Sequence, residues 1–370
     1  MNQDLFFMKR ALELSKKGQC LTCPNPMVGA VIVKDGRIIG EGWHHGPGLP
    51  HAEIEALKDC RTEPKGATMY VTLEPCNHYG RTPPCSEAII KAGIGEVVYA
   101  ISDPNPVAGG GAERLAKAGI KIRAGLCRKE ALELNRKFLH FCLTGRPWVI
   151  MKAAMSLDGK IATAGGESQW ITSEGSRKLV HKLRAEVNSV LVGSGTLLAD
   201  DPQLTNRMFK SSTRQPLKVL LDSELKVTRG HRIIAERPEN LIIFCTAKAP
   251  LKKEADLSTL GVRIIRQAND GKVNLAEAMG ALGKLGVQSV LVEGGSSVFT
   301  SFWELGLVNE YYLFYGPFFI GGKASPGVLG GNGLISLTKA EPLTIEFVKK
   351  IGSDILVHGY KEELQSCLPV

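Results

Sequence analysis

The chain has 370 residues, about twice the length of a typical domain, so two domains are expected. Hydrophobic residues make up 44% and charged residues 22%, near the averages of globular proteins, and no apolar run approaches the roughly 18–20 residues that a membrane-spanning helix needs. The net charge of +9 comes from 46 basic and 37 acidic residues scattered along the chain without a basic stripe, which argues against a nucleic-acid-binding protein.

The first residues, 1–18, mix acidic and basic side chains and lack the apolar core of a signal peptide, which predicts a cytoplasmic protein. The nine cysteines are an odd number spread over a long chain. This distribution argues against a disulfide framework and leaves the question of which cysteines are metal ligands.

The first half of the sequence alternates between predicted helices and strands. A helix is predicted at 4–17, where apolar side chains recur at helical spacing until Gly18. Strands at 27–33 and 37–43 flank Asp35-Gly36, a two-residue hairpin turn. The pattern continues with a helix from His51, a strand at 67–73, a helix after Pro84, a strand at 96–101, a helix near 112–118, a strand at 120–126 and a helix at 128–143.

The segment Thr144-Gly145-Arg146-Pro147 marks the predicted domain boundary, which gives domains at 1–146 and 147–370. The second half alternates again, with strands at 148–154, 189–192, 217–221, 241–246, 289–292, 310–315 and 354–360 and helices at 174–187, at 275–285 and after Ser296. Strands alternating with helices predict two α/β domains with largely parallel sheets.

Four residues of the first domain have the types and order of a catalytic zinc site: His51, Glu53, Cys76 and Cys85. Catalytic zinc takes three protein ligands and keeps a fourth position for water, whose pKa it lowers towards about 7. One His with two Cys provides such ligands. Glu53, two residues after His51, is predicted to carry the proton from water to the leaving ammonia without being a ligand. The pattern predicts a hydrolytic deaminase of a pyrimidine-type ring.

Other interpretations of these residues stay open from the pattern alone. His51 could cap a helix while Cys76 and Cys85 are ordinary buried thiols. Cys20 and Cys23 form a Cys-x-x-Cys pair that could hold a structural zinc, although no second pair lies at zinc-ribbon spacing.

Three further histidines lie near the motif: His44, His45 and His78. A role in binding a polar substrate suits them better than metal ligation, and the alternative is that they are solvated loop residues.

The second domain is less explicit. Gly294-Gly295-Ser296-Ser297 follows a predicted strand and opens a helix, so its backbone N–H groups could hold a phosphate. Gly193-Ser194-Gly195-Thr196 ends another strand, and ligands of open α/β sheets gather at such ends. From the residues alone, Trp170 in its polar loop is not distinguished from an ordinary core aromatic. Asp200 and Glu293 are acidic candidates that could instead cap neighbouring elements.

With these residues in view, the chain resembles the family of bifunctional deaminase–reductases of riboflavin biosynthesis over nearly its whole length. The first domain is similar to the cytidine-deaminase superfamily and the second to a reductase with the dihydrofolate-reductase fold. The matching segments of the first domain are Pro24-Asn25-Pro26, Val28-Gly29-Ala30, Gly42-Trp43-His44, His51-Ala52-Glu53, Glu74-Pro75-Cys76 with the insert that ends in Gly80-Arg81-Thr82-Pro83-Pro84-Cys85, and Asp103-Pro104-Asn105-Pro106. Those of the second are Ser156-Leu157-Asp158-Gly159-Lys160, 166–172, Gly193-Ser194-Gly195-Thr196, 200–205, Leu221-Asp222-Ser223 and 292–296.

The resemblance implies two consecutive reactions in a homodimer. The first domain would use zinc to deaminate 2,5-diamino-6-(5-phosphoribosylamino)pyrimidin-4(3H)-one, and the second would reduce the ribosyl group to ribityl with NADPH. The implied residues of the deaminase substrate site are Asn25, His44, His78, Arg81, Asp103 and Asn105, with Arg81 as a phosphate contact. Those of the reductase substrate site are Ser168, Arg184, Leu204, Arg207 and Glu293, and those of the NADPH site are Ala154, Trp170, Thr196, Asp200, Ser223, Gly294, Gly295, Ser296 and Ser297.

Two alternatives remain at this point. The chain could be a deaminase of another base whose second domain only binds a nucleotide, or it could bind RNA, as a base deaminase or as a nucleic-acid sensor. An RNA-binding protein would show RNA affinity with a steep salt dependence.

Overall fold

The structure is a computed structural model that describes residues 3–19, 21–80, 83–105, 107–208 and 215–361. It divides into two compact units, and the chain passes from the first to the second between Gly145 and Arg146. The expected boundary lay one residue further along. Among the described residues, no helix combines the length and the apolar character needed to cross a membrane.

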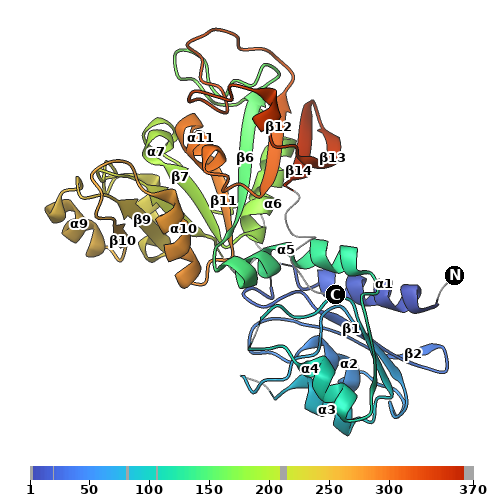
Figure 1. Cartoon of the computed structure of the whole chain (residues 1–370). Coiled ribbons are helices and arrows are strands. Elements are labelled where there is room, and N and C mark those ends of the chain that lie inside the picture. The colour runs from blue at the N-terminus through green and yellow to red at the C-terminus, as the bar shows by residue number, and fades with distance from the viewer. Residues whose placement is uncertain (1–2, 20, 81–82, 106, 209–214, 362–370) are drawn as a thin grey trace. The chain divides into compact units, whose positions relative to one another are not determined.

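The first unit is a five-stranded sheet with helices on both faces (Figure 1). Its elements are α1 (Gln3–Lys16), β1 (Gly29–Lys34), β2 (Arg37–Trp43), α2 (Ala52–Lys58), β3 (Thr68–Val71), α3 (Cys85–Lys91), β4 (Glu96–Tyr99), α4 (Gly111–Lys117), β5 (Lys121–Ala124) and α5 (Arg128–Thr144).

The sheet of this unit has the strand order β2-β1-β3-β4-β5. Only β3, β4 and β5 run parallel, because β1 pairs antiparallel with both β2 and β3. The prediction of a largely parallel sheet is therefore wrong for this unit, which is mixed. The predicted hairpin accounts for one of the two antiparallel pairs, that of β1 with β2. Asp35 (φ 51°) and Gly36 (φ 74°) both adopt the left-handed conformation of a tight two-residue turn, which returns the chain antiparallel.

Close packing of helices on the sheet depends on glycines in β1 and β2. A Cβ atom at Gly29 would lie 2.0 Å from the Ala11 carbonyl oxygen of α1. On the other face, a Cβ atom at Gly42 would lie 2.3 Å from the Ala52 carbonyl oxygen of α2. Helix α1 thus packs on one face and α2 on the opposite face, and their apolar residues complete the core of the unit. The position of α2 matters for function because it begins directly after His51.

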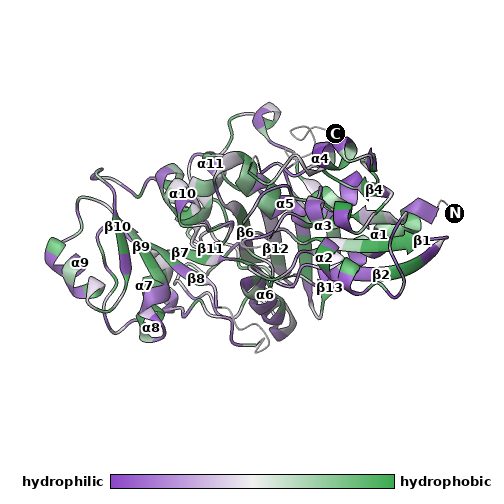
Figure 2. Ribbon diagram, turned by 90° about the horizontal axis from the view of Figure 1, so that it is seen from below, coloured by the Kyte–Doolittle hydropathy of each residue, from purple (hydrophilic) through white to green (hydrophobic). Residues whose placement is uncertain are grey.

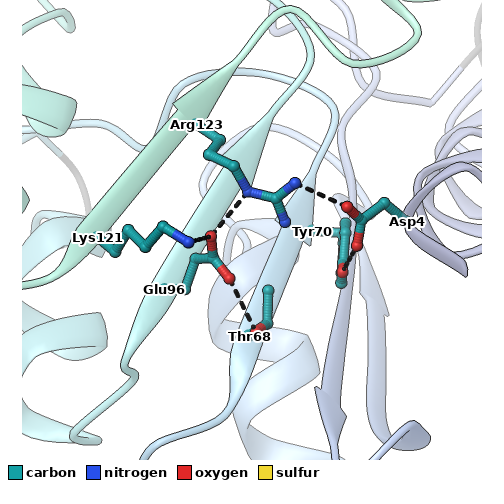
Figure 3. Close-up of polar contacts among 6 residues, drawn as sticks. All are labelled: Asp4, Thr68, Tyr70, Glu96, Lys121 and Arg123. Carbon is teal, nitrogen blue, oxygen red and sulfur yellow. Dashed lines mark hydrogen bonds and ion pairs between the residues drawn. The ribbon is translucent and has the colours of Figure 1, made fainter.

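A polar cluster ties α1 to β3, β4 and β5 (Figure 3). The Arg123 guanidinium lies 2.7 Å from both a carboxylate oxygen of Asp4 and one of Glu96. The Tyr70 hydroxyl donates to the other oxygen of Asp4 at 2.5 Å. The remaining members, Thr68 and Lys121, contact Glu96. This network spans residues far apart in sequence and stabilises the sheet edge away from the hairpin.

The second unit is built on a nine-stranded sheet. Its elements are β6 (Trp148–Ser156), α6 (Glu174–Glu186), β7 (Ser189–Gly193), α7 (Ser194–Asp200), β8 (Leu217–Leu221), α8 (Arg232–Ala235), η1 (Pro238–Asn240), β9 (Leu241–Cys245), α9 (Leu251–Ser258), β10 (Arg263–Arg266), α10 (Leu275–Lys284), β11 (Ser289–Gly294), α11 (Ser296–Glu304), β12 (Glu310–Gly316), η2 (Leu337–Lys339), β13 (Thr344–Ile351) and β14 (Asp354–Tyr360). The prediction omitted α7, α8, α9, β10 and β13, which are short or exposed and so leave little hydrophobic periodicity to detect.

The strand order of this sheet is β10-β9-β8-β7-β11-β6-β12-β14-β13. All pairs from β10 to β12 are parallel, and only β14 and β13 are antiparallel additions, so the prediction of a largely parallel sheet is confirmed here. Apolar residues of α10 and α11 pack on one face, and Val180 of α6 packs with Phe314 and Leu356 on the other. Figure 2 shows the central strands largely green and α6 largely purple, as expected for buried strands beneath an amphipathic helix.

Candidate active sites

Three predicted metal ligands of the first unit lie together. His51 is the N-cap of α2, Cys76 follows β3, and Cys85 is the first residue of α3. The Nδ1 atom of His51 lies 3.5 Å from the Cys76 sulfur and 3.3 Å from the Cys85 sulfur. Among the described residues, these three form the cluster of His, Cys and acidic side chains arranged to hold a metal ion.

The cluster fits zinc. Tetrahedral zinc with Zn–S bonds of about 2.3 Å and Zn–N bonds of about 2.0 Å separates sulfur from nitrogen by roughly 3.6 Å, close to the two distances found here. Hydrogen bonding from the Cys85 side chain lowers the pKa of Cys76, which favours the thiolate form that binds a cation. The geometry thus favours the zinc interpretation over a helix cap beside two ordinary thiols.

Glu53 lies beside this cluster and is 3% exposed. It belongs to the first turn of α2, and it lines the same cavity as His51 and Cys76. Burial, together with the neighbouring negative charge of Cys76, raises the pKa of Glu53 to about 7. A carboxyl group with this pKa both accepts and releases a proton near neutral pH, as a general acid–base requires.

The cavity has a volume of about 380 Å³ and is enclosed by residues from several loops. Of the predicted substrate residues of this unit, those that line it are Asn25, His44, His78, Asp103 and Asn105. Cys85 lies behind the lining and is fully buried. Arg81 lies outside the described residues. Cys20 does too, so the Cys20–Cys23 alternative is not tested by the structure.

The histidines near the motif have different positions. His44 Nδ1 lies 3.1 Å from the Pro50 carbonyl oxygen, which can only accept, so Nδ1 is the donor. Its Nε2 then accepts from the Asn25 amide at 2.9 Å, and burial lowers the pKa of His44, consistent with a neutral ring. His44 therefore orients Asn25. His78 lines the cavity, and its Nδ1 atom is enclosed without a hydrogen-bond partner among the described residues. His45 stacks on Trp43 and is not part of the cavity lining.

Glu74 is a cavity residue to which the sequence analysis gave no role. Its carboxylate accepts from the backbone N–H of Ala112 at 3.0 Å and of Asp103 at 3.4 Å. It therefore holds the loop that brings Asp103 and Asn105 to the cavity. Burial raises the pKa of Asp103 to about 6. The signal for Glu74 was its place in the Glu74-Pro75-Cys76 motif, but only the fold reveals the loop that it anchors.

The second unit has a larger cavity of about 530 Å³ at the ends of β6 and β7. The predicted residues that line it are Ala154, Ser168, Trp170, Arg184, Thr196, Asp200, Leu204, Arg207 and Glu293. Ser223 and the turn from Gly294 to Ser297 are not among its lining residues.

A buried ion pair braces this cavity. The Arg184 guanidinium makes two hydrogen bonds to the Glu293 carboxylate, at 2.6 and 2.7 Å, and a third to the Thr205 carbonyl oxygen at 3.1 Å. Burial alone would raise the pKa of Glu293, but the charge of Arg184 more than offsets it and holds the pKa below its usual range. Since a guanidinium has five N–H groups, Arg184 keeps two for a ligand.

Lys152 on β6 also lines the cavity, although the sequence analysis did not single it out. Its ammonium lies 5.9 Å from the centre of the Phe314 ring, and burial lowers its pKa. Because Lys152 lies in an otherwise apolar strand, the sequence pattern shows it only as one polar position in a buried strand and gives no indication of a cavity.

Trp170 is 68% exposed, so it is not a core aromatic. The Arg177 guanidinium lies 4.6 Å above its ring, and both side chains line the cavity. Ser168 donates a hydrogen bond of 3.0 Å to Asp200 in the same region. This arrangement leaves the indole available for stacking against a ligand.

The two glycine turns of the second unit lie in contact. A Cβ atom at Gly294 would lie 2.9 Å from Thr196 Oγ1. Gly295, with φ of 74°, directly precedes the start of α11 at Ser296, as predicted. Gly193, in contrast, is the N-cap of α7, so Ser194 to Thr196 form a helical turn and not an open loop.

Comparisons with known proteins match both units. Residues 1–101 match the model of the cytidine and deoxycytidylate deaminase zinc-binding region, and residues 147–357 match the RibD C-terminal domain. The riboflavin biosynthesis protein RibD of Bacillus amyloliquefaciens is 42% identical over 95% of this chain and 94% of its own length. RibD of Escherichia coli is 41% identical over 96% of this chain and 99% of its own length.

The chain belongs to the RibD family of riboflavin biosynthesis proteins. Solved structures agree: Acinetobacter baumannii RibD has a TM-score of 0.88 and 37% identity, with 98% of this chain and 99% of that chain covered. The diaminohydroxyphosphoribosylaminopyrimidine deaminase/5-amino-6-(5-phosphoribosylamino)uracil reductase of Thermotoga maritima has a TM-score of 0.82 and 37% identity, with 97% and 99% covered.

As a RibD protein, the chain is a bifunctional deaminase and reductase with a cytidine-deaminase-like domain followed by a RibD reductase domain. Zinc and NADPH are its cofactors. The family, fold class, enzyme class and cofactors expected from the sequence are thereby confirmed. The roles of individual site residues stay predictions.

Proposed function

We propose that the first unit deaminates 2,5-diamino-6-(5-phosphoribosylamino)pyrimidin-4(3H)-one and that the second reduces the ribosyl group of the product to ribityl. The Thermotoga maritima relative, which carries these two activities in its name, supports the substrate assignment. The observation that carries the proposal is one cavity lined by His51, Cys76 and the buried Glu53, with Cys85 completing the cluster directly behind the lining.

In the deaminase step, His51, Cys76 and Cys85 would hold the zinc ion, which would supply a Lewis acid to activate water. Glu53 takes a proton from the attacking water and delivers it to the amino group, which leaves as ammonia while the ring carbon gains the carbonyl oxygen. Asn25, held by His44, would hold the pyrimidine by a hydrogen bond, and His78 lines the same cavity.

In the reductase step, bound NADPH would supply a hydride, and C1 of the ribosyl group is the carbon to be reduced. As the bond from C1 to the ring oxygen breaks, that oxygen needs a proton. Lys152 is the cavity-lining ammonium for this task, because burial lowers its pKa and so eases proton release. The pair of Arg184 and Glu293 orders the wall of the cavity around it.

We also propose a homodimer. The edge strand β13 supports it, because its apolar residues Ile345, Phe347 and Val348 are 51%, 40% and 63% exposed. An exposed apolar edge strand is a ready site for pairing with another chain. Sedimentation of the purified protein tests this.

A coupled assay tests the proposed function. Zinc content is measured, the deaminase substrate is supplied, and ammonia release and NADPH oxidation are followed in one sample. Stoichiometric zinc, ammonia release and subsequent NADPH loss are expected. Zinc and ammonia without NADPH loss would overturn the reductase assignment, and NADPH loss only on an externally supplied deaminated substrate would overturn the deaminase assignment.

A further inference from the structure

His181 lies in the reductase cavity but has no role in the proposed reaction so far. It stands on α6 one turn before Arg184, and both residues line the cavity with Arg207. The residue is only 7% exposed. The presence of a nearly buried histidine beside two arginines requires an explanation, because both burial and positively charged neighbours disfavour the protonated ring.

Hydrogen bonding defines the tautomer of His181. Its Nδ1 lies 3.4 Å from the backbone nitrogen of Arg207, and a backbone N–H can only donate. Burial, followed by the charges of Arg184 and Arg207, lowers the pKa of His181 to about 4, so the ring is neutral at neutral pH. Nδ1 is therefore the acceptor, and the single ring proton is on Nε2.

The Nε2–H group has no hydrogen-bond partner among the described residues. The nearby Thr205 Oγ1 atom is enclosed by protein and has no hydrogen-bond partner among the described residues. The Nε2 atom of His181 is not enclosed in this way. Since His181 lines the cavity, its free donor opens onto that space. An N–H donor held at this position by the rest of the protein is preorganised for a ligand acceptor.

We propose that His181 is a substrate-binding residue whose Nε2–H donates to the phosphate group of the ribosylamino substrate, beside Arg184 and Arg207. The inference rests on the proposed reductase function. Arg184 retains two N–H groups after its contacts with Glu293 and Thr205, and it lines the same cavity as His181, so the two side chains together supply donors for an anion.

The substrate phosphate is favoured over the phosphates of NADPH for a structural reason. The turn from Gly294 to Ser297, which is the predicted phosphate site of the cofactor, lies against Thr196 and does not line the cavity. His181 lines the cavity together with Arg184 and Arg207, two predicted substrate residues. A neutral donor between two arginines also adds a hydrogen bond without a third positive charge, which would repel the other two.

The test compares His181→Leu, which removes the donor, with His181→Gln, whose amide restores an N–H group. Binding of 5-amino-6-(5-phosphoribosylamino)uracil and of its dephosphorylated form is measured by calorimetry without NADPH. A hydrogen bond to a charged group predicts roughly tenfold weaker binding of the phosphorylated ligand by His181→Leu and recovery to within about threefold by His181→Gln. Binding of the dephosphorylated form is expected to stay the same in all three proteins.

Several outcomes would overturn the inference. Equal weakening of both ligands would mean that His181 only supports the loop of Arg207. A loss of NADPH affinity alone would assign the donor to the cofactor, and unchanged affinity for the phosphorylated ligand would remove His181 from the site.

Failure of the proposed function is recognised separately. In that case the wild-type protein does not oxidise NADPH with the deaminated substrate. His181 is then tested with inorganic phosphate as the probe: weaker phosphate binding by His181→Leu supports the phosphate contact, and equal binding overturns it.

Discussion

The buried pair of Arg184 and Glu293 offers a sharp test of the structure. We predict that Arg184→Met strongly destabilises the second unit, because it removes the partner of a carboxylate whose side chain is only 8% exposed. The Arg184 side chain itself is 12% exposed, so the exchange replaces one nearly buried side chain by another of similar length. The expected loss of stability is therefore mainly electrostatic and does not come from a packing defect.

The magnitude follows from the burial of both partners. Removing one member of a buried ion pair costs about 3–5 kcal/mol, because the remaining charge is left without compensation. For a domain of this size each kcal/mol lowers the melting temperature by about 2–4 °C, which gives a fall of roughly 6–20 °C. The deficit shrinks as the pH falls: without Arg184, burial raises the pKa of Glu293, and protonation then removes the uncompensated charge.

Calorimetric unfolding of the full chain measures this, with the zinc-loaded first unit as internal reference. The double variant Arg184→Met/Glu293→Met is expected to recover most of the loss. Lys182→Met on the same helix is the matched control: Lys182 is 56% exposed and 3.8 Å from Glu186, so its removal changes stability by at most about 0.5 kcal/mol. A fall below about 2 °C for Arg184→Met, or no recovery in the double variant, would refute the reasoning.

The other predictions concern both cofactor sites and the polar cluster of the first unit. Glu53→Gln should keep zinc and lower deamination by about 10²–10⁴-fold, and near-normal ammonia release would exclude Glu53 as the proton carrier. Cys85→Ser should lose zinc and ammonia release but retain NADPH oxidation on supplied deaminated substrate; full zinc occupancy would remove Cys85 from the ligand set. Gly294→Val places a side chain where even a Cβ lies 2.9 Å from Thr196 Oγ1, so NADPH should bind roughly tenfold more weakly or worse while deamination continues. Arg123→Met should cost the first unit about 1 kcal/mol at low salt and less at 1 M NaCl, because its partners are only partly buried; an equal loss at both salt concentrations would contradict this.

Local sequence patterns were sufficient to predict the cluster of His51, Cys76 and Cys85 and much of the fold. His51 and Glu53 are two residues apart at a helix start, and this spacing alone puts both side chains at one end of α2. Asp35 and Gly36 likewise specify their hairpin, because a two-residue turn depends on those two residues. The long helices and buried strands were predicted because their hydrophobic periodicity is strong over many residues.

Only the tertiary structure decided the partners of residues far apart in the chain. Arg184 meets Glu293 across 109 positions, and His44 is seen to orient Asn25 only once two separate loops are brought together. Lys152 and His181 have no signal in the sequence, because periodicity tells that a side chain is buried but not which cavity it faces. The types and spacing of neighbouring residues determine local chemistry. The direction in which a donor or a charged group points depends on packing between elements that are distant in sequence, and a local pattern does not contain that information.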